Sequence, residues 1–206
     1  MNDSFLSVSP ADWSPDDRIL LLTAVRPDTS RDIGMVAADG TGGWVPLVAT
    51  AADESAPTMS ADGRWFAYAA SDESGRSEVY VQRFPELGGR QPVSVGGGFS
   101  PRWSDDGTEI LYIQGVPPVD ESLMRVSVET TDDTPPSLRL GPPEALFDWT
   151  YFAVPDFVAQ SFDVTADGEH FLVLTSGERE SDGQYRAEIN VVLNWFEELE
   201  RLVPIP

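Results

Sequence analysis

Four aspartates recur at equivalent places in the chain, and carboxylates at regular spacing could hold a metal ion. They stand in the segments Trp13-Ser14-Pro15-Asp16-Asp17-Arg18, Met59-Ser60-Ala61-Asp62-Gly63-Arg64, Trp103-Ser104-Asp105-Asp106-Gly107-Thr108 and Val164-Thr165-Ala166-Asp167-Gly168-Glu169. Calcium needs about six to eight oxygen ligands converging on one point, whereas these carboxylates lie one in each repeat. Asp caps its own tight turn and Gly supplies a positive φ. The pattern therefore favours structural turns at Asp16, Asp62, Gly63, Asp106, Gly107, Asp167 and Gly168.

Other residues with catalytic chemistry lack the partners that they need. His170 is the only histidine and begins an apolar run, while a catalytic triad or a multi-histidine metal site needs further groups with defined roles. The Gly-x-Ser-x-Gly nucleophile elbow of hydrolases does not occur in the sequence. Gly96-Gly97-Gly98 lacks the Lys-Ser/Thr of a phosphate-binding loop, and the turn at Ser60 only superficially resembles a sialidase Asp-box. We expect no catalytic residue, no metal and no cofactor.

One aromatic cluster lies outside the repeat and is a candidate interaction surface. It consists of Trp149, Tyr151, Phe152 and Phe157. This insert lengthens the last interval between repeated turns to 61 residues, against 46 and 44 for the other two. Aromatic groups gathered on a surface often mark a contact with a partner. Local packing is the alternative interpretation.

The elements that position these residues are predicted to be short strands. Period-2 alternation, broken by Gly and Pro, predicts four consecutive strands in each of the first three units, and four strands are the content of a propeller blade. The predicted blades span residues 11–49, 56–95, 100–149 and 161–193 of one domain covering 1–206. Thr130 to Pro143 is predicted to be an exposed loop. Residues 194–203 are predicted to form a C-terminal helix, with Asn194 as N-cap.

The fourth predicted unit lacks a fourth strand, and the N-terminus offers a candidate. Phe5 to Val8 precedes the first blade, where the outer strand of a preceding blade belongs. It could pair with Ile189 to Leu193 and close a ring of four blades, near the lower limit of about four to eight. Alternatively, the chain is the last part of a larger propeller. We favour this second interpretation, and expect an all-β, partial propeller.

Composition limits the classes of partner. The formal net charge is −22, all 13 basic residues are arginine, and cysteine is absent. A strongly anionic surface repels nucleic acid and anionic lipid, so we expect neither as a partner. No run reaches the ~18 apolar residues of a membrane span, and the first residues lack the features of a secretory signal. We therefore expect no membrane contact by this chain itself.

The repeated turns resemble the Ser-Pro-Asp-Gly turns of WD40-like, TolB-type propellers. The segments Ser71–Pro85, Gly96–Ser104 and Ile189–Leu199 also resemble the C-terminal sensor region of bacterial serine/threonine protein kinase-like proteins. In that family a cytoplasmic kinase domain, a membrane helix and the propeller share one chain. If the chain is part of such a membrane-anchored protein, the resemblance implies that the propeller is extracytoplasmic. If the chain is complete, we expect it to be cytoplasmic.

The sequence departs from the family pattern at the turns, where Asp17 replaces Gly and Asp105, Ala61 and Ala166 replace Pro, and in two further ways. Gly34 stands where the family usually has a large aromatic residue in the third strand, which should weaken the first blade. The Gly-rich loop, the His-Arg-Asp and Asp-Phe-Gly motifs and lysine are absent, so kinase activity cannot be transferred to this chain. We expect a non-catalytic module that binds or senses a protein or small molecule. The alternatives are an accessory propeller of a prolyl-oligopeptidase-type hydrolase and a stand-alone propeller that dimerises through open blade faces.

Overall fold

The protein is known from a computed structural model, which describes residues 5–27, 30–71, 75–116, 119–149, 162–165, 168, 170–179 and 185–192. Every helix or strand assigned in these ranges is a strand, and there are 16 of them. No helix in the described ranges has the length and apolar content needed to cross a membrane. The predicted helix at 194–203 lies outside the described residues.

The strands form four antiparallel sheets, each made from a continuous part of the chain. The first contains β1 (Ser7–Trp13), β2 (Ile19–Val25), β3 (Arg31–Ala37) and β4 (Val45–Val48). The second contains β5 (Asp53–Met59), β6 (Trp65–Ser71), β7 (Ser77–Arg83) and β8 (Gln91–Pro92). The third contains β9 (Phe99–Trp103), β10 (Glu109–Val116), β11 (Val119–Thr130), β12 (Leu138–Leu140) and β13 (Glu144–Trp149). The fourth contains β14 (Phe162–Val164), β15 (Phe171–Arg179) and β16 (Tyr185–Val192).

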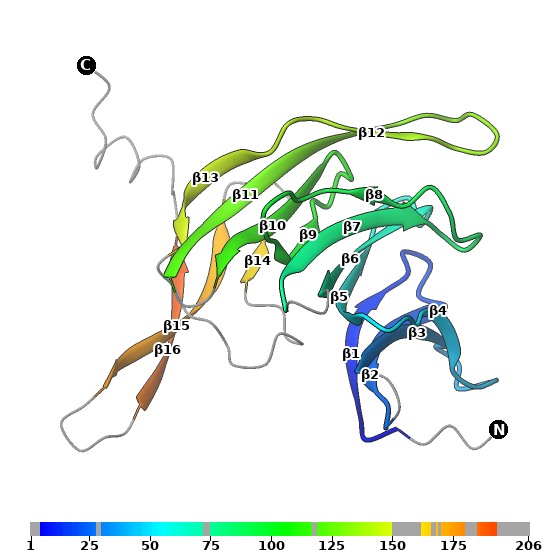
Figure 1. The fold of residues 1–206 in the computed structure, drawn as a ribbon, viewed down its shortest axis with the longest axis horizontal. Helices are drawn as coiled ribbons and strands as arrows, with labels where there is room; N and C mark the ends of the chain where they lie inside the picture. The colour runs from blue at the N-terminus through cyan, green and yellow to red at the C-terminus, as the bar shows by residue number, and fades with distance from the viewer. Residues whose placement is uncertain are drawn as a thin grey trace.

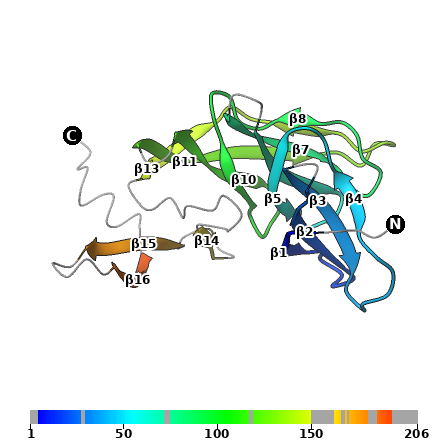
Figure 2. The same ribbon diagram turned by 60° about the horizontal axis from the view of Figure 1, so that its bottom comes forward.

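The sheets follow one another along an arc, as the blades of a propeller do (Figure 1). The first strand of each of the first three sheets lies on the inner side of the arc, because β5 contacts both β1 of the preceding sheet and β9 of the following sheet. Figure 2 shows the first and fourth sheets at opposite ends of the molecule. The all-β propeller architecture predicted from the repeated turns is therefore confirmed.

Apolar side chains between neighbouring sheets hold the arc together. Successive residues of a strand point to opposite faces, so each sheet has a leading face toward the preceding sheet and a trailing face toward the next. Between the first and second sheets, Leu21 and Ile33 pack with Phe66 and Met59. The next two interfaces are built in the same way. Trp65, Ala67, Val79, Trp103 and Tyr112 share one cluster, and Leu111, Ile113, Leu123, Phe162 and Phe171 share another.

The N-terminal segment does not form the outer strand of a preceding blade, so that hypothesis was wrong. Ser7 pairs with Val25 and Val8 with Ala24, inside the first sheet. Among the described strands, β16 pairs with β15 alone. The first strand, Ser7–Trp13, runs through Pro10. The pairing register shifts there, which is where a sheet tolerates proline.

The segment from Thr130 to Pro143 is also more ordered than predicted. Leu138 to Leu140 form β12, which pairs with the end of β11. Leu138 is 4% exposed and joins the core between the second and third sheets. Burying this leucine stabilises an extra strand within a segment whose prolines indicated a loop. The long strand β11 thus pairs with β12 at one end and with β13 at the other.

Candidate functional site

The repeated turns share one hydrogen-bond pattern. In the second sheet, Ser60 Oγ donates to Asp62 Oδ1 at 2.6 Å and accepts from the backbone N–H of Trp65 at 3.0 Å. The same hydroxyl-to-carboxylate bond joins Ser14 to Asp16 at 2.6 Å and Ser104 to Asp106 at 2.7 Å. Each carboxylate also accepts a bond from a backbone N–H two residues later. The aspartates therefore close their own turns.

The fourth turn keeps part of this pattern. Thr165 Oγ1 accepts a bond from the backbone N–H of His170 at 3.1 Å, and the N–H of Gly168 donates to the carbonyl of Thr165 at 2.8 Å. His170 thus flanks the turn, while Asp167 lies outside the described residues.

The hydrogen bonds keep the turn carboxyls ionised. Bonds from the Thr108 backbone and the Ser104 hydroxyl lower the pKa of Asp106 below its ordinary value. The Ser14 hydroxyl likewise lowers the pKa of Asp16. Partial burial raises the pKa of Asp62, but bonds from Ser60 and Arg64 outweigh it and the pKa is lowered overall. All three side chains therefore carry a negative charge at neutral pH.

Consecutive turns also contact one another. A Cβ placed on Gly63 would lie 3.5 Å from Pro15 Cδ, and one placed on Gly107 would lie 3.6 Å from Ala61 Cβ. Both glycines have positive φ, 68° and 71°. The residue after each serine therefore packs on the glycine of the following turn. We call the side of the molecule formed by the turns Ser14–Arg18, Ser60–Arg64 and Ser104–Thr108 the turn face.

The turn hydrogen bonds predict a measurable loss of stability in Ser60→Ala. Ser60 is 3% exposed, so the variant leaves the buried N–H of Trp65 without its acceptor, and we expect the free energy of unfolding to fall by about 1–2 kcal/mol. Urea unfolding would measure it. Thr41→Ala is the matched control, since it removes the same kind of bond, to Asp39, at an exposed turn. Equal losses in the two variants would contradict the role given to burial.

A pocket of about 390 Å³ opens on the turn face between the second and third sheets. It is lined by Ser60, Ala61, Asp62, Arg64, Asp106, Gly107 and Thr130. Arg64 is held by two carboxylates, with Nε 2.7 Å from Asp62 and Nη1 3.0 Å from Asp132. All hydrogen bonds to Asp106 within the described residues are accepted by Oδ1. Its Oδ2 is thus available to a ligand.

This pocket was not predicted from the sequence. The turn motif marked Asp62 and Asp106, but nothing in the motif places two turns from adjacent sheets beside each other. Thr130 comes from the end of β11, far along the chain. Only the regular offset of the repeats could have indicated that the two carboxylates face a common space.

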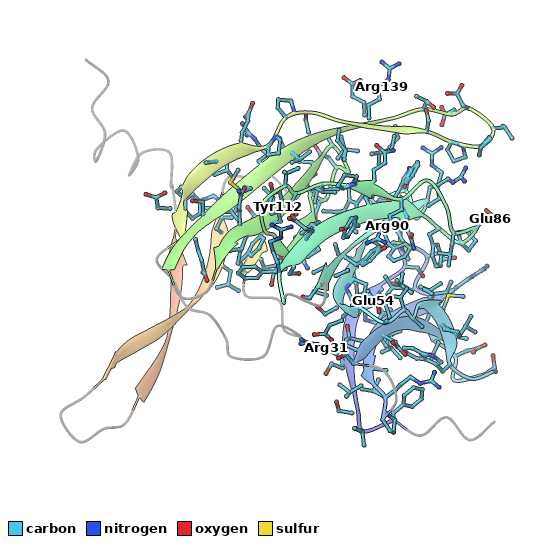
Figure 3. All side chains as sticks on the ribbon, in the orientation of Figure 1. Arg31, Glu54, Glu86, Arg90, Tyr112 and Arg139 are labelled. Carbon is cyan, nitrogen blue, oxygen red and sulfur yellow. The ribbon has the colours of Figure 1, made fainter. Side chains whose placement is uncertain are left out.

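A second polar cluster lies at the opposite ends of the strands, and sequence reasoning missed it. Arg31 donates from its backbone N–H and Nε to Asp53 Oδ1, at 3.0 and 2.8 Å, which ties the first sheet to the second. Glu54 is 1% exposed and accepts a bond from the Thr50 hydroxyl. Burial raises the pKa of Glu54 above its ordinary value. Figure 3 shows Arg31 and Glu54 where these two sheets meet.

Arg90 covers two tyrosines above this cluster (Figure 3). Its guanidinium carbon lies 3.7 Å from the ring centre of Tyr80 and 5.9 Å from that of Tyr68. Burial raises the pKa of Tyr68 to about 12, so this phenol stays protonated at neutral pH. The cluster is a structural junction between sheets, with its charges engaged by neighbouring groups.

The remaining predicted residues are placed as follows. Trp149 ends β13, opposite Glu121 of β11, whereas Tyr151, Phe152 and Phe157 lie outside the described residues. Gly96 to Gly98 connect β8 to β9, and the N–H groups of Gly96 and Gly97 both donate to Glu78 at 3.0 Å. Across the described ranges, no group of three or more histidine and carboxylate side chains could hold a metal ion.

Comparison with known proteins relates the chain to propellers by fold. No model of a protein family matches the sequence, and no curated protein matches it. TolB from Acinetobacter baumannii is 16% identical with a TM-score of 0.61, over 91% of this chain and 44% of that chain. A protein of Agrobacterium tumefaciens described as a TolB is 21% identical with a TM-score of 0.57, over 70% of this chain and 50% of that chain. A prolyl endopeptidase is 14% identical with a TM-score of 0.50, over 88% of this chain and 29% of that chain.

The chain thus spans half or less of the length of each of these three solved proteins. Identities this low support the fold and nothing more specific. These similarities agree with the observed architecture, in which consecutive sheets follow one another with their first strands on the inside. The chain has a β-propeller fold of the TolB type.

Proposed function

We propose that the chain is a non-catalytic propeller module that binds a cationic group of a protein or small-molecule partner in the turn-face pocket. The observation that carries the proposal is the pairing of Asp62 and Asp106 on the wall of one pocket. Both carboxyls have a lowered pKa. Asp62 and Asp132 neutralise Arg64, so Asp106, whose described hydrogen bonds all go to Oδ1, supplies the carboxylate oxygen for the ligand. A guanidinium or ammonium group suits such a site because it donates charge-assisted hydrogen bonds.

The negative charge of the whole chain supports the same class of partner. A net charge of −22 draws cationic groups toward the surface and speeds their encounter. This long-range attraction does not choose a site. The pocket would supply the selectivity, since its carboxylates are held in place by the turns.

Calorimetric titration with a short oligoarginine peptide tests this proposal, with a citrulline peptide of the same length as the uncharged comparison. We expect the arginine peptide to bind, and Asp106→Asn to weaken its binding about twofold to fivefold, the effect of losing one partly exposed ion pair. Asp105→Asn is the matched control, because it removes the same charge one residue away from the pocket lining. Equal weakening by both variants would mean that only overall charge matters, and the pocket proposal would fail.

The resemblance of three segments to kinase-like sensor regions supports a place at the extracytoplasmic end of a membrane-anchored bacterial protein. The similarity in fold to a prolyl endopeptidase favours a second role, as the accessory propeller of a hydrolase. The flanking genomic DNA would distinguish them. An in-frame kinase domain and membrane helix upstream would support the first role, and an in-frame Gly-x-Ser-x-Gly domain downstream the second.

A further inference from the structure

The turn-face pocket presents a cation as well as carboxylates. Arg64 lines it together with Asp106, and the two residues belong to neighbouring turns. These turns pack on each other, since a Cβ placed on Gly107 would lie 3.6 Å from Ala61 Cβ. The Arg64 side chain is 36% exposed, so solvent reaches part of its guanidinium. The pocket therefore offers groups of both signs to one ligand.

The guanidinium of Arg64 has one local partner and one distant partner. Its Nε donates to Asp62 Oδ2 at 2.7 Å inside the same turn, where the Ser60 hydroxyl also holds Asp62. Its Nη1 donates to Asp132 Oδ1 at 3.0 Å, across 68 residues of sequence. A guanidinium has more N–H donors than these bonds use. Arg64 can therefore bind a further anion while the bond to Asp62 stays in place.

Asp132 holds Arg64 from an exposed position. Its side chain is 97% exposed, and water and salt weaken an ion pair of this kind. Other bonds close the loop that carries Asp132, between β11 and β12. The Thr131 N–H donates to the Ser137 carbonyl at 2.9 Å, and Thr131 Oγ1 donates to Asp133 Oδ2 at 2.6 Å. Asp132 can therefore release Arg64 without loss of the bonds that shape its own loop.

We infer that the ligand of this pocket carries a carboxylate close to its cationic group, as a basic amino acid does, and that this carboxylate displaces Asp132 from Arg64. The inference rests on the proposed function, in which Asp106 holds the cationic group. Arginine and carboxylate form charge-assisted hydrogen bonds that are often bidentate. The pocket, at about 390 Å³, is near the lower end of the range of about 300–1,000 Å³ for small-molecule sites, which suits a ligand of this size.

The charge of the chain also favours a ligand with both signs. A net charge of −22 repels a simple anion before it reaches Arg64. A basic amino acid is not repelled, because its cationic groups outnumber its carboxylate. The free amino acid and the C-terminal residue of a peptide share this chemistry.

Calorimetric titration of the full chain with L-arginine and L-argininamide tests the inference. Argininamide keeps both cationic groups but lacks the carboxylate, and it is the more cationic of the two compounds. The overall charge of the chain therefore favours argininamide, whereas the carboxylate contact predicts that arginine binds about twofold to fivefold more tightly, the effect of one partly exposed ion pair. Arg64→Gln should abolish this preference for arginine. Circular dichroism would confirm that the variant is folded.

Asp132→Asn tests the displacement of the aspartate. The variant should bind arginine about twofold more tightly, since the competitor for Arg64 is removed, and should show no gain in affinity for argininamide. Asp105→Asn is the matched control, because it removes one negative charge near the pocket but leaves both partners of Arg64 in place. A similar change in both variants would contradict the displacement.

The outcomes separate this inference from the proposed function. If the oligoarginine peptide binds through Asp106 but argininamide binds as tightly as arginine, the inference is overturned and the proposed function stands. If neither compound nor the peptide binds, both fail. Glycylglycylarginine identifies the source of the carboxylate. Binding equal to that of arginine would assign the site to the C-terminal residue of a peptide, and weaker binding would assign it to the free amino acid.

Discussion

Trp103→Ala is expected to lower the free energy of unfolding by about 3–5 kcal/mol, the usual cost of removing a buried tryptophan. Trp103 is 4% exposed and lies in the cluster that joins the second and third sheets, with Trp65 and Val79 among its neighbours. Its loss would leave a cavity between two sheets that touch chiefly through such side chains. Urea unfolding followed by circular dichroism would measure the change.

Trp13→Ala is the matched control, since Trp13 occupies the same repeat position but is 51% exposed. We expect a loss below about 1 kcal/mol in Trp13→Ala. A loss in Trp103→Ala no larger than that in Trp13→Ala would contradict the packing described for the third sheet.

A second substitution distinguishes the contribution of the indole ring to stability from that of its N–H group. Within the described structure, Trp103 Nε1 is buried without a hydrogen-bond partner. Trp103→Phe keeps most of the apolar contact and removes this unsatisfied donor, which costs free energy when buried. We therefore expect Trp103→Phe to retain most of the stability that Trp103→Ala loses.

Gly34→Tyr is expected to destabilise the first sheet by about 1–3 kcal/mol through overpacking. A Cβ at this position would lie 2.4 Å from Trp44 Cζ2, so the indole of Trp44 already occupies the space beside the third strand. Trp44 in turn contacts the ring of Phe5, with centroids 5.2 Å apart. The sequence analysis expected Gly34 to weaken the first blade because an aromatic side chain is missing there. It did not foresee that Trp44, from elsewhere in the same sheet, places its indole at Gly34.

The double variant Gly34→Tyr with Trp44→Ala tests the exchange of one aromatic group for the other. Tyr80 holds the equivalent position in the second sheet, opposite Tyr68 as Gly34 is opposite Leu22. A tyrosine at 34 should therefore fit once the indole is gone. We expect the double variant to be at least about 1 kcal/mol more stable than the sum of the single effects implies, measured by urea unfolding. Additive losses would show that Trp44 does not fill the glycine site.

Local signals account for the parts of the fold that were predicted correctly. Each repeated turn combines a hydroxyl residue, an aspartate and a residue with positive φ, and its hydrogen bonds all lie within six consecutive residues. Because these bonds are local, the motif indicates from the sequence where one strand ends and the next begins. The regular offset between turns then indicates repeated sheets, because a single sheet cannot bury both of its faces alone.

Contacts between distant residues decided the rest. The strand at Leu138 exists because the leucine finds a buried site against the second sheet, and the pocket exists because turns from two sheets come together. The buried Glu54 depends on the meeting of two sheets, which no local pattern describes.

By itself, the sequence determined the turns, the alternation of the strands and the repeated all-β architecture, since these depend on residues close together in the chain. Only the tertiary structure decided which face of each sheet is covered. Trp13 and Trp103 stand at the same place in the repeat, yet one is 51% exposed and the other 4% exposed. The physical reason is that a side chain is buried only where a second surface covers it, and the residues near it in the sequence do not specify that second surface.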